Sequence, residues 1–407
     1  MSFKSNAAIT DASDGTEDRN LKILDGVIHA SLIGFLVFSF FSISITQGIL
    51  FVGTMAWVIK VLWTRSFRQL RFPLWLPIVI FCSVSLLAVA AAVDPLYSVP
   101  SLKKLLQFVI IFWVANVVES DRQRDRLILV FISAASLAAI YGIYQASVAG
   151  VALNSRVAGT LSTYMTFAGV LMLAALLGLS RLLLRQPREK WLAVPVLLIF
   201  FCLLLTLTRQ AWLGFAVGTF FLFAVWKRKL LWLVPVFFAA VLLFSPLQVR
   251  ERMQSMLNLE DVTFQERLEL WRGGWRVFKD HPITGCGFRC LNLVHSQYPD
   301  PTGVIKKFRG MHSNIIQIMV DTGILGLVSW LAIWISFFIH LYRQKKLSTH
   351  DSSEGWLTKG SAAVVLGFLA GGIFEVNFYD SEVVMLVYFV MALPFTARGG
   401  KLMERSS

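Results

Sequence analysis

Long apolar runs, separated by short polar stretches, dominate the chain from residue 27 onward. Each run has about the 17–25 residues that an α-helix needs to cross a bilayer. A transmembrane β-barrel would instead alternate apolar and polar residues along each strand. The pattern therefore predicts an all-α fold, a polytopic transmembrane bundle of about 12 helices, over residues 27–46, 48–64, 74–93, 102–118, 127–147, 163–183, 191–208, 211–226, 230–246, 313–341, 359–377 and 382–397.

Composition agrees with a membrane protein. The 407 residues are 56% hydrophobic and only 15% charged, whereas soluble domains are about half apolar and about one quarter charged. A net charge of +14 would suggest a nucleic-acid partner for a soluble chain. In a membrane protein the location of the charges matters more, so we expect membrane lipids and no nucleic acid as partners.

Basic residues mark alternate connections between the predicted spans. The segments KVLWTRSFRQLR, ESDRQRDR, RLLLRQPREK, WKRK, YRQKK and ARGGKLMER are short and basic, as cytoplasmic loops are. This predicts an N-in, C-in topology, in which the first residues lack the features of a signal peptide. The expected organisation is a flexible cytoplasmic tail (1–26), helices one to nine (27–246), a periplasmic loop (247–311), helices ten to twelve (312–397) and a second cytoplasmic tail (398–407).

Arginines gather on the predicted outer face. Arg209 lies between two apolar runs with almost no loop between them, and an ionisable group at that depth suggests a functional site. The alternative is that its side chain reaches the lipid headgroups. The other outer arginines are Arg156, Arg250, Arg252, Arg267, Arg272, Arg276, Arg289 and Arg309.

The segment TFQERLELWRGGWRVFKDHP in the long loop is predicted to be helical. Thr263 and Glu266 have the spacing of a capping box. We expect this helix to lie on the outer leaflet, with Arg267 either turned inward over an active site or exposed. Its predicted apolar face consists of Leu268, Trp271, Trp275 and Phe278.

His312 opens the tenth predicted span within the polar stretch HSNIIQ. Histidine titrates near neutral pH and suits a general base that removes a hydroxyl proton. The alternative is a histidine that only caps the helix. Several arginines on the same face suit a diphosphate, because the planar guanidinium fork matches phosphate oxygens. For a site on the outer face of a membrane, the expected diphosphate is a lipid-linked sugar donor.

Acidic and sulfur-containing residues complete the candidate chemistry. Glu375, Asp380 and Glu382 share the outer turn in GIFEVNFYDSEVVML, where they either orient an arginine or the base or are solvated. We expect no metal site, since HExxH and paired CxxC motifs are absent from the sequence, and no cofactor. An oxidising periplasm would permit a disulfide between Cys286 and Cys290, but their spacing of four residues is short, so the sequence favours free thiols and leaves the disulfide open as the alternative.

Several of these motifs together resemble the O-antigen ligase and polymerase superfamily. The carrying segments are RVAGTL, TRQAWLGF, ERLELWRGGWRVFKDHPITGCGF, HSNIIQIMVDTGILGL and GIFEVNFYDSEVVML, within about residues 150–390. Family members often have asparagine directly after the histidine, whereas here Ser313 precedes Asn314.

The resemblance implies an O-antigen ligase of lipopolysaccharide biosynthesis in the bacterial inner membrane, with its active site facing the periplasm. Such an enzyme is an inverting, metal-independent glycosyltransferase that moves O-antigen polysaccharide from undecaprenyl pyrophosphate to a sugar hydroxyl of lipid A–core. It implies pyrophosphate binding by Arg156, Arg209 and Arg267, and His312 as the catalytic base. Further candidates for binding the donor or acceptor are Arg289, Arg309, Asn314, Glu375 and Asp380.

Three alternatives remain open at this point. An O-antigen polymerase or a protein O-oligosaccharyltransferase would share the donor site and differ in the acceptor. A lipid-linked glycan transporter or flippase would need internal repeats and ionisable groups near mid-membrane.

Overall fold

The computed structural model describes residues 5–152, 155–185, 189–232, 236, 239, 246–258, 260–347 and 355–396. The predicted all-α fold is confirmed over these residues, which form no β-strand. The helices are α1 (Ser5–Phe38), α2 (Ile43–Thr64), α3 (Trp75–Ala90), α4 (Pro95–Ser98), α5 (Val109–Val117), α6 (Asp121–Ala149), α7 (Tyr164–Leu184), α8 (Ala193–Leu205), α9 (Arg209–Trp226), α11 (Leu247–Gln254), α12 (Val262–Asp280), α13 (Leu291–Val294), α14 (Val304–Phe308), α15 (Asn314–Leu347), α16 (Gly355–Gly371) and α17 (Ser381–Ala392). Short 3-10 helices cover Phe67–Gln69, Val99–Phe108, Lys190–Leu192, Arg228–Leu230, Ser255–Leu257, His295–Gln297, Asn377–Tyr379 and Leu393–Phe395.

Six helical segments in the described part are long and apolar enough to cross a membrane. They are Asp18–Phe38, Ile43–Thr64, Pro95–Val117, Asp121–Ala149, Tyr164–Leu184 and Asn314–Gln344. Shorter apolar helices cover Trp75–Ala90, Lys190–Leu205 and Ser381–Phe395. The chain is thus a multi-pass membrane protein. The count of twelve spans and the N-in, C-in direction remain predictions, and the ninth span (230–246) falls mostly outside the described residues.

The first two predicted spans have a different boundary in the structure. α1 begins within the stretch predicted as a tail and ends at Phe38, and α2 begins at Ile43. The side chain of Ser42 caps α2 by accepting a hydrogen bond from the amide of Ile45. This local cap places the turn at 39–42, about five residues before the boundary that hydropathy predicts.

Small residues let α9 and α16 pack closely, at the small-residue spacing of GFAVG (214–218) and GFLAG (367–371). A Cβ atom added to Gly214 would lie 2.4 Å from the carbonyl oxygen of Gly367, and one added to Gly218 would lie 2.8 Å from that of Ala363. Close backbone approach of this kind is the usual way in which small residues join helices in a membrane. It brings the start of α9 beside the turn that follows α16.

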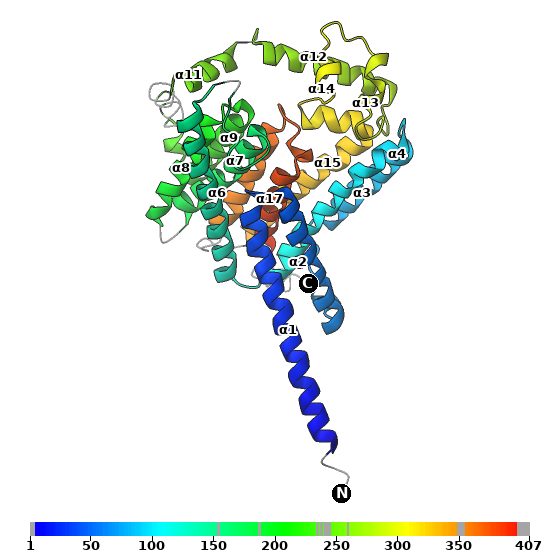
Figure 1. Ribbon diagram of the computed structural model, residues 1–407, viewed down its shortest axis with the longest axis vertical. Helices are drawn as coiled ribbons and strands as arrows, with labels where there is room; N and C mark the ends of the chain where they lie inside the picture. Colours follow the sequence, from blue (N-terminus) through cyan, green and yellow to red (C-terminus); the bar gives the residue numbers. More distant parts are fainter. Residues whose placement is uncertain are drawn as a thin grey trace.

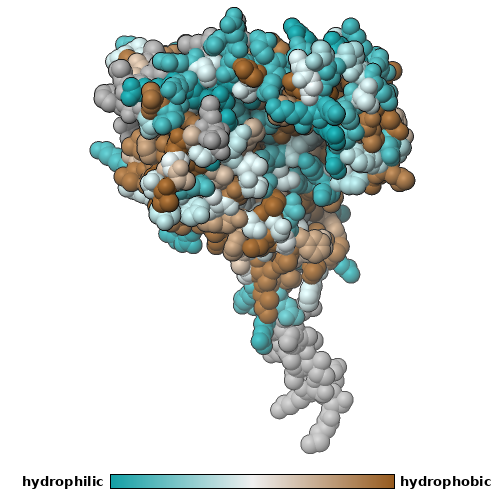
Figure 2. Space-filling model, turned by 45° about the horizontal axis from the view of Figure 1, so that its top comes forward, coloured by the Kyte–Doolittle hydropathy of each residue, from teal (hydrophilic) through white to brown (hydrophobic). Residues whose placement is uncertain are grey.

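The helices α11, α12, α13 and α14, here called the cap, lie across one end of the helical bundle (Figure 1). Hydrophilic residues gather over this end, and hydrophobic residues are more frequent on the sides of the bundle (Figure 2). Such a division suits a body in lipid and a cap in water.

The helix α12 confirms the predicted helix but not its predicted cap or face. The side chain of Asp261, not Thr263, caps its first turn by accepting from the amide of Phe264. The face turned to the protein centres on Leu270 and Val277, whereas Trp275 is 48% exposed. The predicted face included Trp275 because tryptophan counts as apolar. Hydropathy alone does not distinguish a helix face buried in protein from one at the membrane interface.

The helix α15 is interrupted at Gly323, where the sequence predicts one continuous span. Gly323 has φ 65° and ψ −164°, outside the helical range. Residues 282–287 of the loop lie against the break and bond to the released backbone groups. The amides of Cys286 and Gly287 donate to the carbonyls of Val320 and Asp321 at 2.9 and 3.1 Å. Non-helical backbone at membrane depth is stable when protein satisfies its polar groups in this way.

The structure joins Cys286 and Cys290 by a disulfide, the alternative that their short spacing disfavoured. Gly287 and Arg289 both have positive φ, 96° and 62°, between the two cysteines. These conformations fold the segment back on itself and bring the two Cα atoms to 5.8 Å, within the range that a disulfide spans.

Candidate functional site

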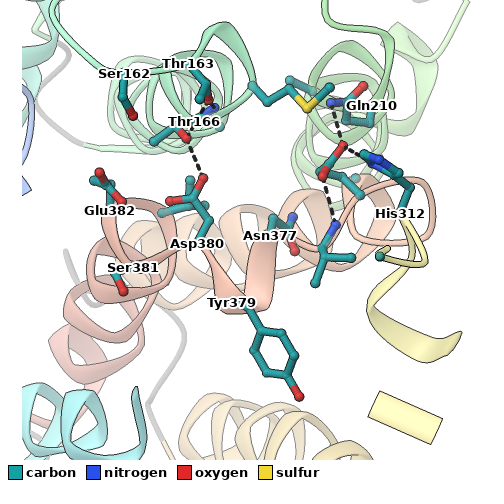
Figure 3. Close-up of a pocket in the computed structure, with 18 of the residues that line it drawn as sticks. Ser162, Thr163, Thr166, Gln210, His312, Asn377, Tyr379, Asp380, Ser381 and Glu382 are labelled. Carbon is teal, nitrogen blue, oxygen red and sulfur yellow. Dashed lines mark hydrogen bonds and ion pairs between the residues drawn. The ribbon is translucent and has the colours of Figure 1, made fainter. Parts of the chain in front are cut away.

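His312, two residues before α15, meets Glu375 of the turn that follows α16. The Nδ1 atom of His312 lies 3.3 Å from Oε2 of Glu375, which also accepts a hydrogen bond from the amide of Gln210 at 3.4 Å (Figure 3). An ionised carboxylate only accepts, so a hydrogen bond between these two atoms requires the proton on Nδ1, and in the neutral imidazole this leaves Nε2 as the acceptor. The backbone of His312 has φ 45°, an uncommon conformation that often accompanies a functional constraint.

Asn314 holds the turn that carries Glu375. Its amide nitrogen Nδ2 donates to Oδ1 of Asn377 at 2.6 Å, and its Oδ1 accepts from the amide of Phe378 at 3.1 Å. Its backbone amide donates to the carbonyl of Gly372 at 2.8 Å. The side chain of Asn314 is buried and engaged by these bonds. It therefore fixes the start of α15 against the turn after α16 and does not face the site.

A cavity of about 590 Å³ opens beside His312. Its described polar lining includes His312, Gln210, Glu375 and Asp380. The Oδ2 atom of Asp380 accepts from the hydroxyl of Thr166 at 2.6 Å, while its buried Oδ1 atom has no hydrogen-bond partner among the described residues. Burial, together with the nearby carboxyl of Glu382, raises the pKa of Asp380 to about 7. The cavity thus has polar groups on two walls.

Arg209, the first residue of α9, is only 7% exposed and is held from the cap. Its guanidinium bonds Oδ1 of Asp261 at 2.8 Å, and both the carbonyl and the hydroxyl of Ser255 at 3.3 Å. The contacts leave the arginine turned into the protein, not out to lipid headgroups. For Asp261, burial raises the pKa, but the hydrogen bond from Arg209 and its charge outweigh this and hold that pKa below its usual value.

Three more arginines lie close to Arg209. Burial lowers the pKa of Arg252 to about 10, and the neighbouring charges of Arg209, Arg156 and Arg267 act in the same direction. Burial and the charge of Arg209 lower the pKa of Arg267 as well. A pKa of about 10 leaves the Arg252 guanidinium charged at neutral pH. We call Arg156, Arg209, Arg252 and Arg267 the arginine cluster.

The arginine cluster reaches His312 through Glu375. Arg267 is buried, its guanidinium lies 5.9 Å from the ring centre of Phe374, and the negative charge of the adjacent Glu375 acts on it. In the described part of the chain this guanidinium has no hydrogen-bond acceptor, so its donors are available to a ligand. Glu375 therefore stands between a candidate base and a set of cations suited to phosphate oxygens.

The structure separates two of the predicted residues from this group. Arg289 and Arg309 line a second cavity, together with Lys104 and Asp321.

Arg156 joins the arginine cluster and stacks at 4.5 Å on the ring of Tyr164. Within the described residues, no group of three or more histidine, cysteine, aspartate or glutamate side chains is placed to hold a metal ion.

Two residues of the site are not distinguishable from their neighbours in the sequence. Arg252 is one of several arginines in the long loop, and only the fold brings it to Arg209. Gln210 follows Arg209 directly, but its role as a donor to Glu375 depends on the packing of α9 against α16. Asp261 was recognisable only through its position just before a predicted helix, where aspartate is a favoured cap.

Comparison with known proteins matches residues 194–331 to the family model described as O-antigen ligase. The matched stretch runs from α8 into α15 and contains Arg209, Arg267 and His312, while Arg156 and Glu375 lie outside it. No curated protein matches the chain. The match confirms the resemblance seen in the motifs for the segment 194–331, which is similar to the O-antigen ligase family.

Proposed function

We propose that the protein is an O-antigen ligase, an inverting glycosyltransferase that moves a glycan from undecaprenyl pyrophosphate to a sugar hydroxyl of lipid A–core. The observation that carries this proposal is the arginine cluster, in which Arg267 has no hydrogen-bond acceptor among the described residues, together with Glu375, whose charge acts on Arg267 and whose Oε2 contacts His312. Clustered guanidinium groups match a diphosphate in charge and geometry. A histidine oriented by a carboxylate matches a general base.

In the proposed reaction, the acceptor oxygen forms a bond to the anomeric carbon of the donor sugar. The bond from that carbon to the diphosphate oxygen breaks, and its electron pair leaves with undecaprenyl pyrophosphate. The acceptor proton moves to Nε2 of His312, while the contact of Nδ1 with Glu375 stabilises the resulting imidazolium. Attack from the face opposite the leaving group inverts the anomeric configuration.

The arginine cluster would act on the leaving group. Negative charge on the diphosphate grows as the glycosidic bond breaks, and cations fixed in place beforehand stabilise that change without reorganising. Arg267 would contribute most directly, because its donors have no acceptor among the described residues, whereas Arg209 bonds Ser255 and Asp261 and Arg252 donates to the carbonyl of Leu207. This arrangement supplies the charge that a divalent metal supplies in other transferases, so we propose a metal-independent reaction.

We also propose that the cap lies in the periplasm and that the bundle spans the inner membrane. The basic connections ESDRQRDR and RLLLRQPREK then lie on the cytoplasmic side, as the positive-inside rule requires. The polar start of α15 is tolerated in this arrangement, because it lines a wet cavity and not lipid.

Reconstitution tests the proposal. Purified protein in proteoliposomes is given a lipid-linked glycan with one of three acceptors: lipid A–core, a second lipid-linked glycan or a pilin-like peptide. We expect transfer to lipid A–core in the presence of EDTA. Transfer only to the second glycan or only to the peptide would instead identify a polymerase or a protein O-oligosaccharyltransferase. Movement of the donor across the bilayer without any transfer would contradict the enzyme altogether.

A further inference from the structure

A second cavity, of about 520 Å³, lies on the other side of the turn that carries Glu375. It lies between the start of the fourth predicted span and the segment after the disulfide. The basic side chains lining it are Lys103, Lys104, Arg289 and Arg309, and the acidic one among the described residues is Asp321. Asp321 is already bonded by the amide of Gln317 at 3.0 Å. The cavity is therefore strongly cationic.

The basic side chains of this cavity make hydrogen bonds and ring contacts, but none of them forms an ion pair with a carboxylate among the described residues. Lys104 donates to the carbonyl of Tyr379 at 2.6 Å, and Arg309 donates through Nε to the carbonyl of Lys306 at 3.2 Å. Arg289 stacks at 5.1 Å on the ring of Tyr97. None of these contacts is with a carboxylate, so no ion pair neutralises these cations in the described part of the chain. Lys103, Arg289 and Arg309 are exposed, and a ligand can reach them.

This second cavity adjoins the cavity of His312. Phe308, Gln317 and Tyr379 line both. The ring of Phe308 lies edge-on to the imidazole of His312, with 5.3 Å between ring centres. The ring of Tyr379 points away from Asp380 and His312 (Figure 3), toward the second cavity that it also lines. A molecule lying across this wall would have one group among the cations and another near Nε2 of His312.

We infer that the second cavity binds a phosphate group of the acceptor glycolipid and so places the acceptor hydroxyl at His312. The inference rests on the proposed function and names the recognition site for its acceptor. A phosphate monoester carries a charge of about −1.5 to −2 near neutral pH. This charge suits a cavity whose basic side chains outnumber its one described acidic side chain, Asp321. The diphosphate of the donor is accounted for by the arginine cluster, on the other side of Glu375.

Binding to a zwitterionic nanodisc containing the protein tests this inference. The ligands are a phosphorylated acceptor glycolipid and the same glycolipid after phosphatase treatment. For the wild-type protein we expect the phosphorylated form to bind at least about tenfold more tightly, the effect of one or two hydrogen bonds to a charged group. Equal affinities would overturn the inference, whether or not the protein transfers glycan.

Variants locate the effect. In the double variant Lys103→Gln/Arg289→Gln, we expect the affinity ratio between the two glycolipids to fall toward one. In Lys103→Arg/Arg289→Lys, which keeps the charges, we expect this ratio to recover in large part. The matched control, Arg272→Gln/Lys279→Gln, removes the same charge from the exposed side of α12 and should keep the wild-type ratio. A ratio unchanged in the first variant, or equally reduced in the control, would overturn the site.

A final arm separates the acceptor from bulk phospholipid as the source of phosphate. Phosphatidylglycerol added to the nanodisc should change the affinity ratio by less than about threefold, the change expected from general surface charge. Displacement of the phosphorylated glycolipid by phosphatidylglycerol would show a lipid headgroup site and would overturn the inference. Glycan transfer is measured separately, so selective binding without any transfer would sustain this site and contradict the proposed function.

Discussion

The Nδ1 atom of His312 lies 3.3 Å from Oε2 of Glu375, although the two residues are 63 positions apart in the chain. The contact favours the tautomer with the proton on Nδ1, because a carboxylate can only accept. It also ties the first turn of α15 to the turn between α16 and α17. The proposed base is therefore oriented by an element that lies outside the matched family domain.

The first prediction concerns this contact. Glu375→Gln should lower kcat by roughly ten- to a hundredfold, as loss of an orienting partner typically does. The amide can donate to Nδ1 and so favour the wrong tautomer. The measurement is a steady-state transfer assay with purified protein.

Glu382→Gln is the matched control for that change. Glu382 lines the same cavity but makes no described contact with His312, so its kcat should exceed that of Glu375→Gln by tenfold or so. Equal losses in the two variants would show that the negative charge of the cavity, and not orientation of the imidazole, is what matters.

The second prediction concerns the arginine cluster. Arg209→Lys and Arg252→Lys each keep a positive charge and lose the planar fork. We expect kcat/KM for the lipid-linked donor to fall roughly a hundredfold in each, because fixed donors to the leaving group are lost. Arg276→Lys, on the exposed side of α12, provides the comparison and should stay near wild type. Full activity in both cluster variants would exclude the proposed role.

The third prediction uses Asp261 to separate charge from capping. Asn caps a helix about as well as Asp, so Asp261→Asn removes mainly the charge that faces Arg209. We expect a loss of roughly 1–3 kcal/mol in stability, the cost of removing a hydrogen-bonding partner of a charged group. Because the arginines would then lack this carboxylate, inorganic pyrophosphate should raise the melting temperature more in the variant than in the wild type. An equal or smaller rise in the variant would count against anion binding at the cluster.

The fourth prediction follows from the lowered pKa of Asp261. A carboxyl group whose folded-state pKa is lowered stabilises the protein above its unfolded pKa, about 3.9, and this stabilisation is lost as pH falls through the lower folded value. The difference in thermal stability between wild type and Asp261→Asn should therefore be constant from neutral pH down to about pH 4 to 5 and shrink below. A difference that disappears near neutral pH would show another titrating group.

The fifth prediction concerns the break in α15. A Cβ atom at Gly323 would lie 2.2 Å from the carbonyl oxygen of Ile283, and the backbone there has φ 65°. Gly323→Ala should destabilise the protein by about 3 kcal/mol or more through clash and strain, and should reduce activity because residues 282–287 support the start of α15. Gly26→Ala in α1, where a Cβ meets nothing within 4 Å, should change stability by less than about 1 kcal/mol. Thermal unfolding followed by tryptophan fluorescence compares the two.

The sequence predicts the parts of this molecule that depend on local pattern. Apolar runs predict the helices, the spacing of GFAVG and GFLAG predicts close packing, and charge at membrane depth draws attention to Arg209. The turn at Ser42 and the break at Gly323 escape hydropathy, because both depend on individual backbone hydrogen bonds within apolar surroundings. The loop segment that completes the break lies about 40 residues from it in sequence.

Long-range contacts set the limit for the site. Each candidate side chain is visible in the sequence, but its neighbours are not. Nothing local distinguishes Arg252, which joins the arginine cluster, from Arg289, which faces the second cavity. Likewise, the sequence leaves Glu375 open as a solvated turn residue, whereas the fold places it against His312.

The most direct test of the central claim is a single-turnover experiment with labelled lipid-linked donor and saturating lipid A–core, comparing His312→Ala with wild type. We predict that the variant binds the donor with an affinity within about threefold of wild type, while glycan transfer falls by a factor of about 100 to 10,000. Transfer at the wild-type rate in His312→Ala would contradict the account, because the proposed base would then have no part in the reaction.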